Sequence, residues 1–368
     1  MRSSFHRLHT VLFIGFLLLG GGLCVLHTPR SFSEMENRVL TAFPQVSVDG
    51  ILSGQVQRDV EKAAGDQMTG RDYFVQLATG ARYLLGERQI GGVYIGTDGR
   101  YLECVTEADI SEKRLATNIM VTEKIAQEHP HIRTTVFLAP TNSVVAAELL
   151  PEGAYTYEDE AVIETIRAGI SDAQVIYEPD AFSPEEYFLT DHHWNTYGAL
   201  KGAGMYLQSV GMAAPAGGYE VIESEKPFFG TLYSKAPLAA CRGEDFCYPQ
   251  VENEPEVLID GKKGSLYDDS FWDKKDRYAA YFGGNFGRVD IINHASGNED
   301  TLIMVKDSFA NSAIPYLYQG YSHIIMIDLR YYNSSFKQLL AEEKPGELLF
   351  FYEMSDFFQD ENFSKLLK

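Results

Sequence analysis

Basic residues are scarce in this sequence. Its 368 residues include 31 Lys and Arg against 52 Asp and Glu, which gives a formal net charge of −21 at pH 7. A protein that binds a nucleic acid needs clustered cations to neutralise phosphates and release counterions. The basic residues here are scattered among acids, so the composition argues against a nucleic-acid partner.

Cysteine is also scarce, with four residues in the chain. This number is too small for a fold that depends on a disulfide scaffold. Cys241 and Cys247 are close enough in sequence to bridge a small loop in an oxidising compartment, or to remain free thiols. Internal repeats and low-complexity tracts are absent too, whereas 45% of the residues are hydrophobic. The chain can therefore bury a full core, as one large domain or two smaller ones.

An uncharged apolar run extends from Val11 to Leu26 near the N-terminus. Arg2 and Arg7 precede it, which is typical of a signal-peptide core or of a slightly short membrane helix. Because no cleavage site of the Ala-x-Ala type follows, we expect residues 1–29 to act as an uncleaved signal anchor, with a cleaved signal peptide as the alternative. Either role places the remainder outside the cytoplasm, as a single-pass membrane protein or a secreted one.

Residues 30–90 predict a juxtamembrane linker with two helices, near Val56–Ala64 and Tyr73–Leu85. Residues 91–102 predict a β-hairpin that turns at Asp98-Gly99. This segment is rich in glycine but lacks the strand-to-helix setting of a phosphate-binding loop, so it does not indicate a nucleotide site.

From Ser111 onward, short apolar runs alternate with helical patterns. This alternation is typical of a mainly parallel sheet with helices on both faces, so we predict an α/β domain over residues 91–368. The alternation is lost at about residues 211–295, which predicts an irregular insertion that forms a lid or a wall of a cleft. Ligands of such sheets bind at the carboxyl ends of the strands. The side chains expected at that edge are Asn142, Ser308, Arg330 and Tyr331, and Asn142, Arg330 and Tyr331 are therefore candidates for oxyanion or substrate binding.

The stretch Thr190-Asp191-His192-His193-Trp194 gathers a carboxylate, two imidazoles and an indole. In an Asp-x-His arrangement, the carboxylate can orient one imidazole nitrogen while the other takes a proton from a nucleophile. A serine hydroxyl needs such a base. Ser308 follows an apolar strand and precedes a helical run, where its backbone N–H would stabilise developing negative charge. The residues therefore suggest a triad of Asp191, His193 and Ser308.

Simpler interpretations stand beside this hypothesis. An Asp-Ser pair after a strand is commonly a helix cap, and Trp194 can pack in the core as well as offer a platform for a sugar. Asp191, His192 and His193 could also ligate a metal ion, but no further His or Cys stands nearby at a ligand-like spacing. We therefore expect no metal and no cofactor.

The motifs Asp191-His192-His193-Trp194 and Lys306-Asp307-Ser308-Phe309 resemble those of the DHHW family. That family is similar to the SGNH-hydrolase-like polysaccharide O-acetyltransferases of the alginate-acetylation type, in which the two motifs come in the same order. Further likeness lies in Glu36-Asn37-Arg38, in residues 66–71 and in the hairpin of residues 94–102. The likeness therefore spans most of the chain after the N-terminal run.

The resemblance implies an SGNH-hydrolase-like fold with Ser308 as nucleophile, His193 as base and Asp191 as its orienting partner. Two departures affect this site. Lys306 replaces the glycine usual before Asp-Ser, which places a cation beside the nucleophile. A Gly-x-Asn-Asp block with an oxyanion asparagine is not visible, so Asn285 is either its substitute as oxyanion donor or a turn residue.

The resemblance also implies a bacterial enzyme that moves acyl groups, most simply acetyl, onto hydroxyls of a cell-surface or exported polysaccharide through an acyl-serine intermediate. An integral-membrane acyltransferase would supply the acyl group. Arg330, Tyr331 and Trp194 are candidate carbohydrate contacts. Two alternatives stay open: a carbohydrate esterase with the same triad, and a non-catalytic polysaccharide-binding or assembly protein whose triad residues are structural.

Overall fold

The computed structural model of the protein describes residues 2–26, 28–215, 219–251, 253–297 and 299–368. The chain divides into two compact units. The smaller unit comprises residues 1–87 and 236–241, and the larger unit comprises residues 88–235 and 242–368.

Helices dominate the smaller unit. They are α1 (Arg2–Leu26), α2 (Val48–Leu52), α3 (Gln55–Asp66) and α4 (Arg71–Leu84), and a short antiparallel pair is formed by β1 (Phe32–Ser33) and β2 (Arg38–Val39). The helices α3 and α4 match the two helices predicted for this part of the chain. The apolar run Val11–Leu26 lies within α1. Across the described residues, no helix combines the length and the apolar character that a membrane crossing requires.

Ion pairs tie the β1–β2 hairpin to α3 and α4. Arg38 forms a bidentate pair with Asp66 at 2.6 and 3.1 Å, and Arg71 pairs in the same way with Glu36 at 2.8 and 2.9 Å. Asp66 also accepts a hydrogen bond from the backbone N–H of Thr41 at 2.9 Å. Bidentate pairs of this kind fix geometry as well as adding energy. The Glu-Asn-Arg segment therefore has a structural role within the smaller unit.

An eight-stranded sheet forms the centre of the larger unit, in the order β11, β10, β12, β14, β13, β15, β6, β7. The strands from β14 to β7 are parallel to their neighbours, whereas β12, β10 and β11 continue the sheet antiparallel. This confirms the prediction of a mainly parallel α/β sheet. The strands are β6 (Arg133–Ala139), β7 (Gln174–Ile176), β10 (Glu256–Ile259), β11 (Lys262–Lys263), β12 (Arg288–Ile292), β13 (Thr301–Lys306), β14 (His323–Ile327) and β15 (Glu347–Glu353).

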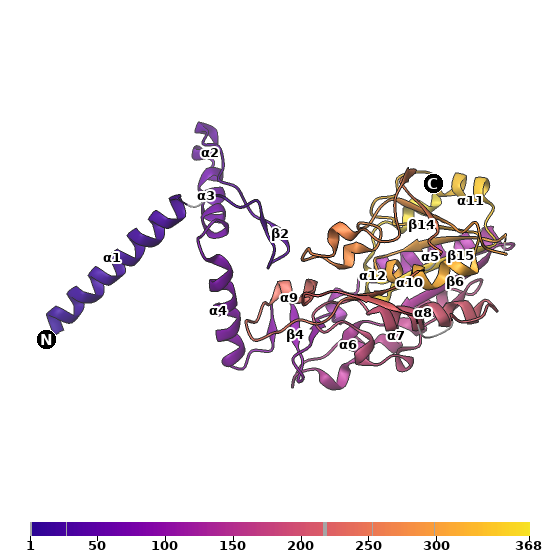
Figure 1. The fold of residues 1–368 in the computed structure, drawn as a ribbon, viewed down its shortest axis with the longest axis horizontal. Helices are drawn as coiled ribbons and strands as arrows, with labels where there is room; N and C mark the ends of the chain where they lie inside the picture. The colour runs from indigo at the N-terminus through magenta and orange to yellow at the C-terminus, as the bar shows by residue number, and fades with distance from the viewer. Residues whose placement is uncertain (1, 27, 216–218, 252, 298) are drawn as a thin grey trace. The chain divides into compact units, whose positions relative to one another are not determined.

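Helices cover both faces of this sheet, as predicted (Figure 1). One face carries α8 (Thr196–Ser209) and α10 (Phe309–Leu317), and the other carries α5 (Glu112–Glu128), α7 (Asp159–Gly169), α11 (Phe336–Glu343) and α12 (Met354–Gln359). Successive strand residues point to opposite faces, so Phe351 packs in the first core and Phe350 in the second. Burial on both faces explains why these strands read as continuous apolar runs.

The segment of residues 211–295 is more regular than predicted. It supplies β10, β11 and β12, which extend the central sheet, so the expectation of an irregular insertion is corrected for these strands. It also holds the antiparallel pair β8 (Val221–Glu223) and β9 (Cys247–Pro249), and the short helix α9 (Thr231–Lys235). Cys247 carries a free thiol, so no disulfide joins it to Cys241.

A small antiparallel sheet precedes the parallel strands. It consists of β3 (Gln89–Ile90), β4 (Val93–Ile95) and β5 (Tyr101–Glu103), and the pairing of β4 with β5 confirms the predicted hairpin. After β6, the short helix α6 (Asn142–Val145) begins at the carboxyl edge of the sheet, where Thr141 caps it by accepting from the N–H of Val144.

Candidate active site

Ser308 stands where β13 ends and α10 begins. Asp307 fixes this turn, because one carboxylate oxygen accepts from the N–H of Phe309 at 2.8 Å and the other from the N–H of Glu353 at 2.5 Å. Ser308 is the N-terminal cap of α10, and its own N–H meets no acceptor among the described residues. The positive end of the helix dipole lies there, so an anion next to Ser308 would be stabilised. The residue keeps 8% of its surface exposed.

His193 reaches Ser308 from the loop between β7 and α8. Its Nε2 lies 2.8 Å from Ser308 Oγ, and its Nδ1 lies 2.6 Å from Asp191 Oδ1. The backbone N–H of His193 donates to the same oxygen at 3.0 Å. The structure thus brings together the three residues predicted as a triad, with the imidazole within hydrogen-bond reach of both partners.

Thr231, at the start of α9, holds the other carboxylate oxygen of Asp191. Asp191 Oδ2 accepts from the N–H of Thr231 at 2.6 Å and from its hydroxyl at 2.9 Å. Burial alone would raise the pKa of Asp191, but the charges of His192 and His193 and the hydrogen bonds from His193 and Thr231 bring the pKa below its ordinary range. Asp191 is therefore ionised at neutral pH and can stabilise an imidazolium at His193.

Two polar side chains hold the loop around Asp191. Glu244 accepts from the N–H of Leu189 at 2.6 Å and from both the N–H and the hydroxyl of Thr190 at 2.8 Å. Burial raises the pKa of Glu244 to about 7, although these hydrogen bonds oppose the rise. Asn142 donates from Nδ2 to the carbonyl oxygen of Asp191 at 3.3 Å. Neither Glu244 nor Thr231 carries a local sequence signal, and our sequence reasoning missed both.

Asn142 stands at the carboxyl edge of the sheet, as predicted, but its side chain is buried. Only 2% of it is exposed, and its Oδ1 accepts from the N–H of Glu103 at 2.9 Å. Both ends of its amide are thus used inside the protein. The prediction of a substrate contact is corrected: Asn142 is a positioning residue for the Asp191 loop.

Tyr278 covers the imidazole of His193. The two rings are nearly parallel, with an interplanar angle of 9° and centroids 3.7 Å apart. The tyrosine hydroxyl lies 2.9 Å from the carbonyl oxygen of Ser308 and 3.0 Å from Ser312 Oγ. Tyr278 comes from the segment of residues 211–295, which therefore supplies a wall of the site.

Trp194 lies in the core, with no exposed surface. Its Nε1 donates to Ser312 Oγ at 2.9 Å and to the carbonyl oxygen of Phe309 at 3.2 Å. A side chain on Gly202 would approach the indole to 2.5 Å, so only glycine fits there. The prediction of Trp194 as a carbohydrate contact is corrected, because a buried ring offers no platform. Instead, Trp194 fastens the histidine loop to the helix that follows Ser308.

His192 has a different environment from His193. Its Nδ1 lies 2.8 Å from Thr231 Oγ1 and 3.3 Å from Asp191 Oδ1. Burial and the neighbouring His193 lower the pKa of His192 to about 4, so this ring is neutral at pH 7. Donor atoms of Asp191, His192 and His193 lie within 4.8 Å of one another, close enough to share a metal ion. An ion there would have to break the hydrogen bonds that Asp191 makes with His193 and Thr231.

Arg330 and Tyr331 follow β14 at the carboxyl edge. The guanidinium of Arg330 pairs with Asp328 at 2.6 Å and keeps 41% of its side chain exposed. It lies 5.7 Å from the centroid of the Tyr331 ring, and Tyr331 is 51% exposed. Both side chains thus have surface available for a ligand, and their role as carbohydrate contacts stays a prediction. Asn285 lies against Lys306, whose ammonium donates to Asn285 Oδ1 at 2.9 Å.

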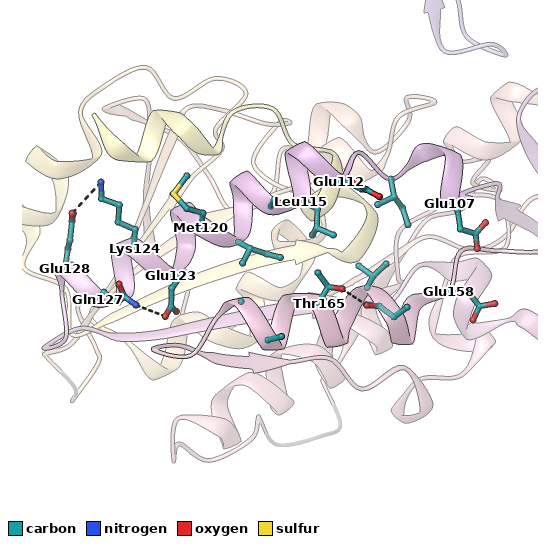
Figure 2. A pocket seen from close by; sticks show the side chains of 17 residues that line it. Glu107, Glu112, Leu115, Met120, Glu123, Lys124, Gln127, Glu128, Glu158 and Thr165 are labelled. Carbon is teal, nitrogen blue, oxygen red and sulfur yellow. Dashed lines mark hydrogen bonds and ion pairs between the residues drawn. The ribbon is translucent and has the colours of Figure 1, made fainter.

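A groove of about 1250 Å³ lies between α5 and α7. Figure 2 shows Leu115 and Met120 in this groove and the carboxylates of Glu112 and Glu158 near one end. No triad residue lines it. Since α5 and α7 cover the sheet face opposite α10, the groove is separate from the Ser308 site.

The larger unit thus combines a mainly parallel α/β sheet with a serine, a histidine and an aspartate that are linked by hydrogen bonds at the edge of the sheet. Residues 175–327 match the model of the DHHW family, described as DHHW protein. The matched range contains Asp191, His193 and Ser308, so the predicted resemblance to this family is confirmed.

Solved structures share the fold. A DHHW family protein from Eubacterium siraeum aligns with a TM-score of 0.65 and 19% identity over 76% of this chain and 96% of that one. Bacillus cereus PatB1 aligns with a TM-score of 0.63 and 20% identity over 74% of this chain and 98% of that one. The structure of B. cereus PatB1 with a sulfonyl adduct aligns with a TM-score of 0.60 and 20% identity over 73% of this chain and 95% of that one. Comparison with curated proteins found no significant match.

Proposed function

We propose that this protein is a serine-dependent acyl-transfer enzyme that moves an acyl group, most simply acetyl, onto hydroxyls of a polysaccharide. The observation that carries this proposal is the continuous path from Asp191 through His193 to Ser308, with contacts of 2.6 and 2.8 Å. A serine hydroxyl is a poor nucleophile unless a base lies within such reach. Positioned acid–base catalysis of this kind is worth about 10²- to 10⁴-fold in rate.

In the first half-reaction, Ser308 Oγ attacks the acyl carbonyl carbon and its proton passes to His193 Nε2. Asp191 stabilises the resulting imidazolium through Nδ1. The oxyanion forms next to the free N–H of Ser308 at the start of α10. His193 then returns the proton to the leaving group as the carbonyl re-forms, which leaves an ester on Ser308.

In the second half-reaction, the acceptor hydroxyl attacks this ester while His193 takes its proton. The new carbon–oxygen bond forms as the bond to Ser308 Oγ breaks, and the proton goes to Ser308. The choice of a polysaccharide acceptor rests on the resemblance to the DHHW family and the O-acetyltransferases to which that family is similar. The same resemblance supports an SGNH-hydrolase-like domain and an integral-membrane acyltransferase as the acyl donor.

A location outside the cytoplasm is part of the proposal and rests on the apolar N-terminal run of the sequence. It predicts that an external protease digests the protein in spheroplasts. Complete protection of the protein, with a periplasmic or surface marker digested in the same sample, would overturn this part.

Covalent labelling tests the enzymatic core of the proposal. PatB1 has been solved with a sulfonyl adduct, so phenylmethanesulfonyl fluoride is a suitable probe. We expect one adduct per chain by intact mass, its loss in Ser308→Ala, and its retention in the exposed control Ser334→Ala. Absence of an adduct in the folded parent would favour a non-catalytic binding protein.

The acceptor is tested with 4-nitrophenyl acetate as donor, with and without an oligosaccharide. We expect nitrophenolate release together with an oligosaccharide whose mass rises by one acetyl group. Release that is unchanged by added oligosaccharide, with acetate as the sole product, would favour a carbohydrate esterase instead.

A further inference from the structure

Lys306 is a buried cation two residues before Ser308. Only 2% of it is exposed, at the end of β13. Burial lowers the pKa of Lys306 to about 8, and the carboxylates of Asp328 and Asp307 oppose this while Arg330 adds to it. An isolated ammonium in such a place would be costly, so its partners must explain why it is there.

Three oxygen atoms surround the ammonium of Lys306. It donates to Asn285 Oδ1 at 2.9 Å and to Asn311 Oδ1 at 2.9 Å, and it lies 3.6 Å from Asp328 Oδ2. Asp328 is itself held by the guanidinium of Arg330 at 2.6 and 2.9 Å. The ammonium has three donors and no acceptor; two of its donors bond the amide oxygens, and Asp328 is its ion-pair partner.

These contacts fix the orientation of the Asn285 amide. A lysine can only donate, so the amide oxygen and not the amide nitrogen must face it. Asn311 Nδ2 donates to the same oxygen at 3.1 Å, which fills its second acceptor position. The NH₂ group of Asn285 therefore points away from Lys306 and Asn311, and it has no partner among the residues that the structure describes.

Both residues that hold the Asn285 amide flank Ser308. Lys306 lies two positions before it, and the N–H of Asn311 donates to the carbonyl oxygen of Ser308 at 3.2 Å, in the first turn of α10. The side chains of both residues contact the Asn285 oxygen, and both residues stand within three positions of Ser308. Two donors without a partner among the described residues, the N–H of Ser308 and the NH₂ group of Asn285, are thus linked through Lys306 and Asn311.

The backbone before Asn285 is also unusual. Phe282, Gly283 and Gly284 have φ values of 64°, 84° and 124°, and Phe282 is a buried non-glycine residue in the left-handed region. Glycine adopts such φ values freely, whereas the left-handed conformation is unfavourable for Phe282 and persists because the surroundings impose it. The turn delivers Asn285 to Lys306.

We propose that Lys306, together with Asn311, is a positioning residue that locks the amide of Asn285 with its NH₂ group toward the acyl carbonyl oxygen, completing an oxyanion site with the N–H of Ser308. This inference rests on the proposed function and deepens it. It gives a role to Lys306, which stands where the family resemblance has glycine: the Lys306 ammonium orients the Asn285 NH₂ group.

A double-substitution cycle tests this inference in the full chain. The variants are Lys306→Met, Asn285→Ala and the pair together, assayed for kcat and KM with 4-nitrophenyl acetate. Removing one oxyanion donor typically costs about 10²- to 10³-fold in kcat. We expect Asn285→Ala to lose about that factor, Lys306→Met to lose at least tenfold with KM changed less than threefold, and the double variant to match Asn285→Ala within threefold.

A purely structural lysine would behave differently. In that case Lys306→Met would lower kcat by the same factor with or without Asn285, and such additive losses would overturn the inference, as would an unchanged kcat in Lys306→Met. Folding of this variant is expected, because Asp328 keeps its pair with Arg330. If it does not fold, Asn311→Ala replaces it in the cycle with the same expectation of non-additivity, and additive losses there also count against the proposed positioning of Asn285.

The sulfonyl probe separates this inference from the proposed function. If Ser308 reacts normally in the parent but the losses in kcat of Lys306→Met and Asn285→Ala are additive, the positioning role of Lys306 is wrong and the enzyme assignment stands. If the parent does not react at all, the proposed function itself has failed.

Discussion

Asp191→Asn is the substitution that the site geometry tests most directly. In the structure, the Asp191 carboxylate receives only donors: the ring and backbone N–H groups of His193 on one oxygen, and the N–H and hydroxyl of Thr231 on the other. An amide of the same shape has one acceptor oxygen and one donor nitrogen. Whichever way the new side chain turns, its NH₂ group meets a backbone N–H.

The size of the effect follows from the two orientations. With NH₂ toward His193, Nδ1 must accept, the ring proton moves to Nε2, and the base cannot take the proton of Ser308. A wrong tautomer of this kind costs about 10⁴-fold in kcat, or about 5 kcal/mol of transition-state stabilisation. With NH₂ toward Thr231, a buried N–H loses its acceptor, at a cost of about 1–3 kcal/mol in the free energy of unfolding.

We expect Asp191→Asn to lower kcat for 4-nitrophenyl acetate by about 10³- to 10⁴-fold, and the free energy of unfolding in urea by about 1–3 kcal/mol. The matched control is Asp180→Asn, an exposed aspartate of the same unit, for which both quantities should equal those of the parent. A folded Asp191→Asn variant whose kcat stays within tenfold of the parent would refute the role assigned to this carboxylate.

Three further predictions concern the supports of the triad. In Gly230→Ala, the new Cβ would lie 2.3 Å from Asp191 Cβ and 2.5 Å from Asp191 Oδ2, so the Asp191 side chain must move. We expect kcat to fall at least about 100-fold. The control Gly65→Ala, which has open space around the new Cβ, should leave kcat unchanged. Tyr278→Phe keeps the ring over His193 and removes the hydroxyl, so thermal and urea melts should show a loss of about 1 kcal/mol while kcat stays within tenfold; a loss as large as that of Ser308→Ala would contradict a supporting role. Burial raises the pKa of Glu244 to about 7 in the folded protein, against about 4.3 in the unfolded chain. The folded state therefore holds the Glu244 proton more tightly. The stability that this proton contributes is fully present below about pH 4 and is lost as pH rises through 7. Relative to Glu244→Gln, the parent should therefore lose about 3 kcal/mol of unfolding free energy between pH 4 and 8. Parallel pH curves would show that folding does not raise the pKa of Glu244.

The parallel part of the sheet was predictable because its strands are buried on both faces. Thr301–Lys306 and Glu347–Glu353 read as apolar runs between helical patterns, which leaves few alternatives to a covered parallel sheet. The antiparallel strands were missed for the opposite reason. Arg288–Ile292 carries Arg288 and Asp290 beside apolar residues, and their pairing with each other and with Glu343 and His323 is visible only in the fold.

The residues of the site also fall into those that the sequence predicted and those that it did not. Asp191 and His193 were found because the Asp-x-His contact is local, between residues two positions apart; the structure makes it in a bend and not on the extended segment expected. Ser308 was found because a strand-to-helix turn has a recognisable pattern. Thr231 and Tyr278 contact these residues across 40 and 30 positions of chain, through a hydroxyl and a ring that occur at many other positions. No local pattern marks such contacts, and the same holds for the indole of Trp194, whose burial decided against a sugar platform.

The surroundings of His193 bear on the competition between a sugar hydroxyl and water. Tyr278 stacks on one face of the imidazole at 3.7 Å, and the rings of His192 and Phe309 lie at 3.8 and 5.0 Å. Both ring nitrogens are engaged, by Asp191 and Ser308. In the proposed reaction, acylation of Ser308 would free Nε2, and the group that attacks acyl-Ser308 would have to reach this nitrogen along the side on which Ser308 is exposed. Under the proposed function, the triad serves transfer and hydrolysis equally, so we expect acceptor binding on that side to decide between them.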